Sequence, residues 1–196
     1  MPKKAKVQKE NIIDAAFELI RENGIEKLTV RDIAKKLHCS IQPIFYQFNT
    51  MEELKKTLLE YTKNYFNEFL FDVKADSDLP RYKETGMNYV RFAIEESNLF
   101  KFIFMGNYDI KIEEMAYFNR SYDEVANILR IQNDLSREIA KKFHQKMWLF
   151  THGIASLLAT HTVEFSDEEI SNLLTEEFQA ILSIVMKDIK LKKEKN

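Results

Sequence analysis

Apolar residues recur every three or four positions along most of the chain, which is the period of an amphipathic α-helix. In the first seventy residues this pattern predicts three short helices and a longer fourth one, at about 8–22, 30–37, 41–48 and 51–73. Two or three less sharply bounded helices follow over 81–130, then long ones over 134–161 and 167–189. The last of these is preceded by an S-x-x-E capping box, Ser166 to Glu169. No stretch has the period of a strand, so the predicted fold class is all-α.

The second and third helices form a compact pair. Thr29 and Ser40 are placed to cap their N-termini through hydroxyl oxygens. Pro43 lies in the first turn of the third helix, where a missing backbone N–H leaves no hydrogen bond unmade. Only His38 and Cys39 then separate the two helices, which is the spacing of a helix-turn-helix over about 29–48.

Composition narrows the possible functions. The chain has four glycines and three prolines in 196 residues, although average usage would give about fourteen and about ten. The glycines are far apart, which excludes Gly-rich phosphate loops, and Gly24 is placed to end the first helix. No apolar run approaches the ~18 residues of a membrane span, and no secretory signal is recognisable. With a single cysteine, Cys39, we expect a soluble cytoplasmic protein.

Charge is distributed unevenly along the chain. Residues 1–56 carry eleven Lys and Arg against eight acidic residues, whereas the remainder carries 18 against 23. A mildly basic first quarter on an acidic body is typical of a small polyanion-binding module joined to a domain that does not bind polyanions. Chance variation together with a basic N-terminal tail would give the same numbers.

The residues of the third helix suit the major groove of DNA. In a helix-turn-helix the second helix enters that groove and contacts base edges with its N-terminal residues. Ile41 and Pro43 offer apolar contacts to thymine methyl groups, and Gln42 offers an amide that can pair with adenine. Ile44 and Phe48 share the opposite face and are expected in the core. The candidate DNA-contacting residues are Thr29, Arg31, Ser40, Ile41, Gln42, Pro43, Phe45, Tyr46 and Lys55.

These residues resemble the N-terminal domain of the TetR/AcrR family of bacterial transcriptional regulators. The resemblance covers about residues 7–66 and is carried by L-T-V-R-D-I-A at 28–34, by S-x-x-x-I-F-Y-x-F at 40–48 and by E-E-L at 52–54. A Trp148-x-x-x-His152-Gly153 stretch resembles one group of TetR-like C-terminal domains. This chain departs from the family at two places. The family usually has Gly and an aliphatic residue where this chain has His38 and Cys39. It often has a phosphate-contacting Lys where this chain has Met51, so Lys55 or Lys56 would have to make that phosphate contact.

The resemblance implies a helix-turn-helix DNA-binding domain over 7–66 joined by a long helix to a helical effector-binding and dimerisation domain over 74–190. Family members are homodimers that bind near-palindromic double-stranded operators. They usually repress transcription until a small ligand, here expected to be apolar or amphipathic, binds the C-terminal domain. An adaptor that binds DNA and other proteins without a small-molecule effector is the alternative.

Aromatic residues cluster in the predicted effector domain. Residues 82–122 hold ten of the 24 aromatics, where an even spread would give about five. Such a cluster can line an apolar pocket or fill a helical core. The candidate pocket residues are Phe92, Phe102, Tyr108, Tyr122, Trp148 and His152.

Two further expectations concern partners and chemistry. The helix predicted over 134–161 carries small residues, among them Gly153, and the helix over 167–189 has a wide apolar stripe. These two features predict a homodimer in which two helices from each subunit form a four-helix bundle. The alternative is that the apolar faces of both helices are buried within one subunit. The sequence contains no Glu-x-x-His, no His pair four residues apart and no C-x-x-C. We therefore expect no metal, no cofactor and no enzymatic activity.

Overall fold

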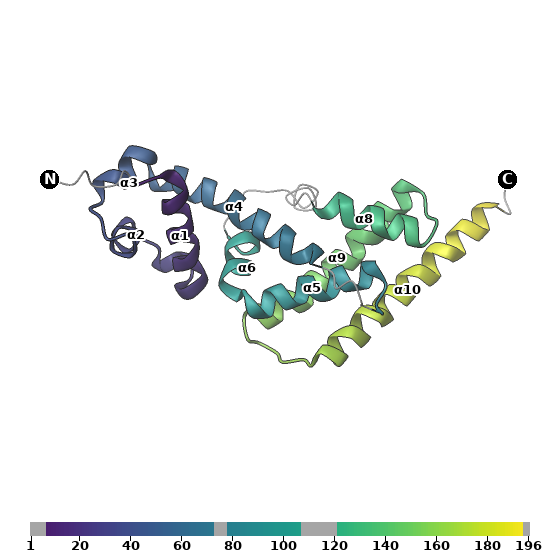
Figure 1. Ribbon diagram of the computed structural model, residues 1–196. Coiled ribbons are helices and arrows are strands. Elements are labelled where there is room, and N and C mark those ends of the chain that lie inside the picture. The colour runs from purple at the N-terminus through teal and green to yellow at the C-terminus, as the bar shows by residue number, and fades with distance from the viewer. Residues whose placement is uncertain (1–6, 73–77, 107–120, 194–196) are drawn as a thin grey trace. The chain divides into compact units, whose positions relative to one another are not determined.

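The computed structural model describes residues 7–72, 78–106 and 121–193, and their regular elements are all helical (Figure 1). The predicted all-α fold is therefore confirmed. By their contacts the residues divide into two compact units, each described by itself here.

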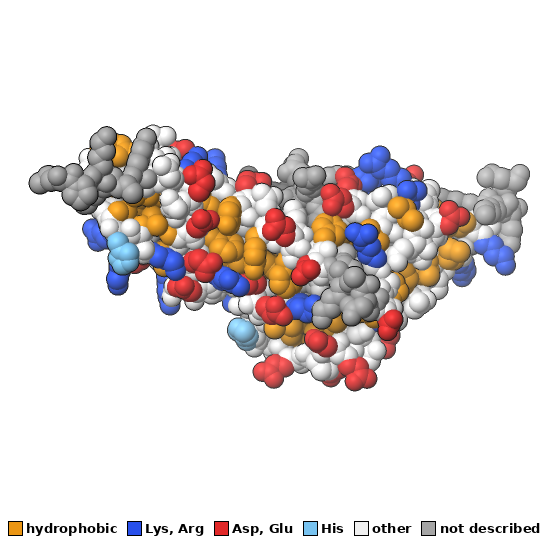
Figure 2. All heavy atoms as spheres, viewed as in Figure 1, with side chains coloured by type: hydrophobic (Ala, Val, Ile, Leu, Met, Phe, Trp, Pro, Cys, Tyr) orange, Lys and Arg blue, Asp and Glu red, His pale blue; other side chains and the backbone are white. Residues whose placement is uncertain are grey.

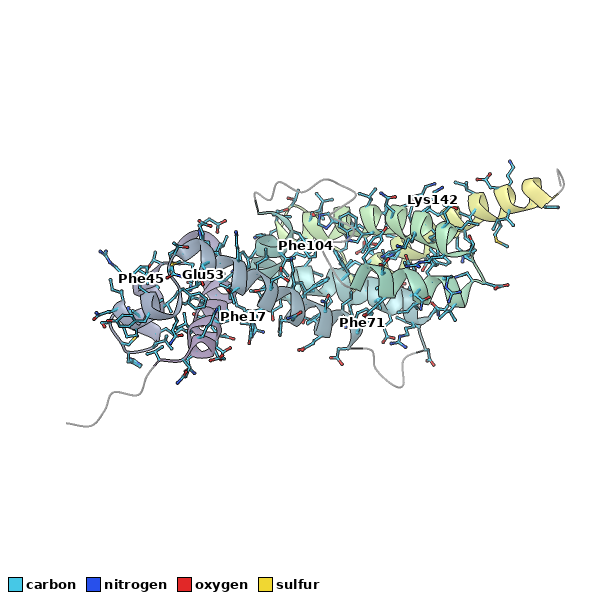
Figure 3. All side chains as sticks on the ribbon, turned by 90° about the horizontal axis from the view of Figure 1, so that it is seen from above. Phe17, Phe45, Glu53, Phe71, Phe104 and Lys142 are labelled. Carbon is cyan, nitrogen blue, oxygen red and sulfur yellow. The ribbon has the colours of Figure 1, made fainter. Side chains whose placement is uncertain are left out.

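Unit 1 comprises residues 1–66 and 96–107. It contains α1 (Lys9–Asn23), the 3₁₀ turn η1 (Ile25–Lys27), α2 (Val30–Lys36), α3 (Gln42–Gln47), most of α4 (Met51–Phe71) and α6 (Ser97–Phe104). The core is formed by the apolar faces of these helices, and Phe17 of α1 (labelled in Figure 3) packs edge-on against Tyr61 and Tyr65 of α4. The four helices predicted in the first seventy residues are all present.

The grouping of α6 with unit 1 differs from the predicted division of the chain, which assigned residues 74–190 to the C-terminal domain. The physical reason is that α6 packs against α1 and buries four apolar side chains, Leu99, Phe100, Phe102 and Ile103. Phe104 also meets Phe66 of α4 edge-on, with ring centroids 5.4 Å apart.

Unit 2 comprises residues 67–95 and 108–196. It contains the end of α4, then α5 (Arg81–Glu95), α8 (Ser121–Gln132), α9 (Arg137–Ala159) and α10 (Asp167–Lys193). Helix α9 lies at the centre of the unit and packs against α5, α8 and α10. Among the described residues, no helix is long and apolar enough to cross a bilayer.

Two helix boundaries in unit 2 differ from the prediction. Helix α9 begins at Arg137 rather than near 134, because Asp134 has a φ of 49° and Ser136 caps the helix by accepting from the backbone N–H of Ile139. Helix α10 continues to Lys193, four residues past the predicted end. Its predicted capping box is present: Ser166 N donates to Glu169 Oε2 over 2.7 Å, and Glu169 N donates back to Ser166 Oγ over 3.3 Å.

Left-handed residues other than glycine end three helices in this glycine-poor chain. His38, Asp134 and His161 have φ angles of 50°, 49° and 54°. After His38, for example, Cys39 N donates to Ala34 O over 2.9 Å, while His38 N donates to Lys35 O over 3.1 Å. This is the Schellman hydrogen-bond pattern, in which glycine usually occupies the left-handed position.

Candidate nucleic-acid interface

The turn between α2 and α3 is longer than predicted and is built differently. Helix α2 ends at Lys36, and α3 runs from Gln42 to Gln47 rather than from 41 to 48. The predicted Ser40 cap is wrong, because the N-cap residue is Ile41, which has helical backbone angles and no side-chain capping bond. The turn contains the left-handed His38, and α3 begins one residue later than expected. Pro43 still lies in the first turn of α3, as predicted.

Capping of α2 follows the prediction. The Thr29 hydroxyl oxygen accepts from Asp32 N over 3.2 Å, and the same hydroxyl donates to the Asp32 carboxylate. Both hydrogen-bonding functions of Thr29 are thus already used within the helix terminus. For the Thr29 hydroxyl to donate to a phosphate, it must first lose its hydrogen bond to the Asp32 carboxylate.

Helix α3 has one buried face and one exposed face. Ile44 and Phe48 are each only 1% exposed, which confirms their predicted place in the core. On the other side, the exposed fractions of Ile41, Phe45 and Tyr46 are 43%, 44% and 76% (Figure 3 labels Phe45). An apolar and aromatic surface of this kind on a six-residue helix and its N-cap residue is unusual unless a partner covers it.

A hydrogen bond organises this exposed face. Gln42 Nε2 donates to the hydroxyl of Tyr46 over 2.9 Å, one helical turn away, and both residues are exposed. The bond restricts the rotamers of both side chains and leaves the amide oxygen of Gln42 to accept and the Tyr46 hydroxyl to donate elsewhere. The face thus offers one acceptor, one donor and the apolar surfaces of Ile41 and Phe45 side by side.

The remaining predicted DNA-contacting residues surround α3. Arg31 and Ser40 are exposed, and Pro43 and Lys55 are half-buried. Glu53 in the first turn of α4 accepts from the backbone N–H of Asn49 over 2.9 Å and from its amide over 3.0 Å. These hydrogen bonds lower the pKa of the Glu53 carboxyl. The structure thus places all nine predicted residues in unit 1, but it places an ionised carboxylate near them as well.

Sequence reasoning missed two contacts that hold the start of the described chain against α3. Gln47 Nε2 donates to the backbone carbonyl of Val7 over 3.1 Å. Lys9 Nζ lies 4.7 Å from the centre of the Phe48 ring, a cation–π contact. The partners are about forty residues apart in sequence, so no local pattern signals either contact.

Of the predicted effector-pocket residues, the structure places Phe92, Tyr122, Trp148 and His152 in unit 2, and Trp148 contacts His152. Phe92 of α5 packs edge-on against Phe69, with ring centroids 5.3 Å apart. Tyr122 of α8 lies against His144, and Trp148 stacks on His152 within α9, with centroid separations of 4.4 and 4.9 Å. Phe102 belongs to unit 1, and Tyr108 lies outside the described residues.

Two tyrosine–histidine pairs in unit 2, with buried tyrosines, also escaped prediction. The Tyr82 hydroxyl lies 2.9 Å from His144 Nδ1, and the Tyr89 hydroxyl lies 2.9 Å from His152 Nδ1. Burial raises the pKa of both phenols, lowers that of His144 to about 3 and lowers that of His152. The two tyrosines are seven residues apart on α5 and the two histidines eight apart on α9, so each helix presents its pair two turns apart.

A hollow of about 610 Å³ lies between α8 and the N-terminal end of α9. Its lining is largely polar and charged, and it includes none of the six predicted pocket residues; the lining contains Asp123, Glu124, Asn127, Arg130, Arg137 and Lys141. Among the residues that the structure describes, no cluster of three His, Cys, Asp or Glu side chains could hold a metal ion.

Comparisons with known proteins agree with this geometry. Residues 12–57 match the family model of bacterial regulatory proteins of the tetR family. IcaR of Staphylococcus epidermidis, the negative transcriptional regulator of the biofilm operon icaADBC, is 31% identical over 96 residues. That alignment covers 49% of this chain and 45% of IcaR, so the chain spans less than half of the length of this relative.

Two solved structures share the fold. A putative TetR-family regulator from Vibrio parahaemolyticus superimposes with a TM-score of 0.63 at 18% identity, covering 89% of this chain and 98% of that one. A TetR variant from Acinetobacter baumannii AYE, in complex with minocycline, gives a TM-score of 0.55 at 16% identity, covering 95% and 98%. The matched helix-turn-helix segment and the shared all-helical fold support the TetR/AcrR family of bacterial transcriptional regulators, with residues 12–57 as its DNA-binding segment.

Proposed function

We propose that this chain is a sequence-specific DNA-binding repressor that acts as a homodimer and is released from its operator by a small ligand. Members of its family are regulators and not enzymes. The observation that carries the proposal is the exposed face of α3, where Ile41, Gln42, Phe45 and Tyr46 lie together at the surface of a unit that is otherwise well packed. Binding to chromosomal DNA would place the protein in the cytoplasm.

The chemistry of this face fits the major groove. The groove is about 12 Å wide and admits one α-helix, whose side chains can then reach base edges. The Gln42 amide can pair with adenine, Ile41 and Phe45 can contact thymine methyl groups, and the Tyr46 hydroxyl can donate to a phosphate. Lys55, Arg31 and the first-turn N–H groups of α2 would contact the phosphate backbone and fix the register.

Dimerisation is supported by an unpartnered apolar stripe on unit 2. Leu149, Gly153 and Leu157 are spaced four residues apart on α9, and the two leucines are 46% and 43% exposed. A Cβ added to Gly153 would meet no atom within 4 Å, so the surface there is open to a close helix approach. Helix α10, which packs on α9, adds Ile184 at 53% exposed, and Figure 2 shows hydrophobic side chains along it.

Two such helices from each subunit would form a four-helix bundle. The twofold axis of the dimer would then present two α3 helices to two half-sites about 34 Å apart, one helical turn of DNA. A near-palindromic operator follows from that symmetry.

Two observations support release by a ligand. The A. baumannii structure contains minocycline, and unit 2 contains buried aromatic side chains with polar partners, such as Tyr82 with His144 and Tyr89 with His152. An adaptor without an effector would have the same DNA-binding unit. Addition of a library of metabolites to a protein–DNA complex distinguishes the ligand-released repressor from the adaptor. Release of the DNA by any compound supports the repressor and contradicts the adaptor.

The test of DNA binding is a titration of the protein with DNA selected from a random pool. We expect Gln42→Ala to change the preference at one or two base pairs by about 1–3 kcal/mol. We expect Lys55→Ala to weaken all sequences alike, with Lys142→Ala on α9 of unit 2 as its matched control. No preference of the unaltered protein for any sequence would contradict the proposal.

A further inference from the structure

Gln42 and Tyr46 meet at the surface of α3, one helical turn apart. Gln42 Nε2 donates to the Tyr46 hydroxyl over 2.9 Å. Both residues are exposed, Tyr46 by 76%, so this hydrogen bond rather than the core of unit 1 holds the two side chains together. What either side chain offers to DNA therefore depends on the other.

A glutamine amide can turn either its oxygen or its nitrogen toward a base, and the two orientations match different purines. With the oxygen and one N–H directed outward, the amide matches adenine, which presents the N6 donor beside the N7 acceptor. With both N–H groups directed outward, it matches guanine, which presents the two acceptors N7 and O6. An exposed glutamine that can turn over therefore discriminates poorly between adenine and guanine.

The Tyr46 hydroxyl can pair with either end of the Gln42 amide. A hydroxyl both donates one hydrogen and accepts, so it can accept from the amide nitrogen or donate to the amide oxygen after the amide turns over. A phosphate oxygen, in contrast, only accepts. Once Tyr46 donates its hydrogen to a phosphate, its oxygen can only accept, and the Nε2 end of the amide must face it.

We propose that Tyr46 is a positioning residue for base recognition. Its hydroxyl donates to a DNA phosphate and accepts from Gln42 at the same time, and this pair of hydrogen bonds directs the Gln42 amide oxygen to adenine. The inference rests on the proposed function, in which the two side chains contact DNA separately.

The hydrogen-bonding capacity of the Gln42 amide is sufficient for this arrangement. Nε2 carries two hydrogens, so one stays on Tyr46 while the other pairs with N7 of the adenine and the amide oxygen accepts from N6. A phosphate contact carries no sequence information by itself. Through Tyr46 it nevertheless raises the selectivity of Gln42 for one base.

The first arm of the experiment measures base preference with the full-length protein and duplexes that carry each of the four base pairs at each position of the selected site. The position that Gln42 contacts is the one at which Gln42→Ala loses discrimination. We expect Tyr46→Phe, which removes only the hydroxyl, to reduce the preference for adenine over guanine there by about 2- to 12-fold, the effect of one hydrogen bond. If Tyr46→Phe instead weakens all four base pairs by one factor, the inference is overturned.

The matched control is Tyr61→Phe on α4. It removes a hydroxyl that donates to Asp14 over 3.1 Å in the same unit, and it should leave the ratio of adenine to guanine unchanged. Native-state hydrogen exchange at the α1 amides, unchanged in Tyr46→Phe, shows that unit 1 remains folded in that variant.

The second arm repeats Tyr46→Phe in the Gln42→Ala background. We expect it to weaken all duplexes by one factor and to leave every base preference unchanged, because no amide remains to be directed. An equal change of preference in both backgrounds would mean that Tyr46 contacts the base itself, which would overturn its assignment as a positioning residue.

The third arm tests the phosphate. A methylphosphonate replaces one charged oxygen of a single phosphate with a methyl group, which weakens that phosphate as an acceptor. In a scan of singly substituted duplexes, we expect one position to lower the adenine preference of the unaltered protein and to have no further effect on that preference in Tyr46→Phe. A scan without such a position would overturn the inference.

The outcomes separate this inference from the proposed function. If the unaltered protein prefers the selected DNA and Tyr46→Phe keeps the full preference for adenine, the inference is overturned while the proposed function stands. If the unaltered protein prefers the selected DNA but Gln42→Ala changes no base preference, the inference is likewise overturned. If the unaltered protein shows no preference for any sequence, the proposed function fails and the inference fails with it.

Discussion

Arg21 of α1 binds the carboxylate of Glu96, which lies at the junction between α5 and α6, through two nitrogens on one edge of its guanidinium group. Arg21 Nε donates to Glu96 Oε2 over 2.8 Å, and Nη2 donates to Oε1. The Tyr65 hydroxyl of α4 donates to the same carboxylate over 3.2 Å. Because the Glu96 side chain is only 6% exposed, it depends on these donors in place of water.

Removal of the guanidinium should therefore destabilise unit 1. Arg21→Met keeps most of the aliphatic stem and leaves a buried carboxylate with one donor, at a cost of about 1–3 kcal/mol in the free energy of unfolding. Native-state hydrogen exchange at the α1 amides measures this quantity for unit 1 alone. Glu18→Gln is the control, because Glu18 is an exposed partner 3.9 Å from Arg21 and should cost less than about 0.5 kcal/mol. Equal effects of the two substitutions would contradict the assigned role of Glu96.

Replacement of the left-handed His38 should stabilise the helix-turn-helix. At a φ of 50°, a side chain costs roughly 1–2 kcal/mol, whereas glycine loses about 0.5–1 kcal/mol more chain entropy on folding. We expect His38→Gly to raise the free energy of unfolding of unit 1 by about 0.5–1 kcal/mol in the same hydrogen-exchange measurement. Lys35→Gly in the neighbouring helix should lower it by about 1 kcal/mol. A destabilised His38→Gly variant would show that the His38 side chain makes a stabilising contact larger than this strain.

These two sites show how far the sequence could predict unit 1. The spacing of apolar residues placed Ile44 and Phe48 in the core and Gln42 and Tyr46 outside, because helical period and burial are local properties of α3. The conformation of His38 was not predictable in this way. A residue other than glycine carries no strong signal for left-handed geometry, so Ser40 appeared to be the natural cap.

Contacts between residues far apart in the sequence could not be predicted. Arg21 and Glu96 are 75 residues apart, Val7 and Gln47 40 apart, and Tyr82 and His144 62 apart. Only the packing of helices brings these partners together, and that packing also explains why α6 groups with unit 1. The clustering of aromatics in 82–122 was visible in the sequence, but their distribution over several separate contacts was not.

Unit 2 should lose stability as the pH falls. Burial holds the pKa of His144 at about 3, below its ordinary value of about 6.5, although nearby Asp123 favours the charged form. The unfolded chain therefore binds a proton between these values that the folded chain excludes, so stability is complete above about pH 6.5 and falls by about 1.4 kcal/mol per pH unit below it.

Trp148, the single tryptophan, reports the unfolding of unit 2 in urea. We expect His144→Gln to lower stability at pH 7 but to flatten its pH dependence between pH 6.5 and 5. The pH dependence that remains in this variant comes from His152, because burial also lowers the pKa of that residue, and from other titratable groups. An unchanged slope in His144→Gln would mean that His144 is protonated in the folded protein.

A charge on the apolar stripe of α9 should separate the proposed dimer. Leu157→Glu places a carboxylate at a side chain that is 43% exposed in the single chain and buried in the four-helix bundle. Sedimentation velocity at micromolar concentration should then show a monomer. Ile131→Glu on α8, at a side chain that is 64% exposed and belongs to neither α9 nor α10, should remain dimeric. A monomer in the unaltered protein would contradict the bundle.

The central claim is that the exposed face of α3 reads DNA. The most direct measurement is the affinity of the full-length protein for a duplex selected from a random pool, compared with a scrambled duplex at about 150 mM salt. We expect the selected duplex to bind at least about 10³-fold more tightly. We also expect Gln42→Ala to reduce this ratio by roughly 5- to 150-fold through one or two base pairs. Equal affinity for both duplexes in the unaltered protein would contradict it.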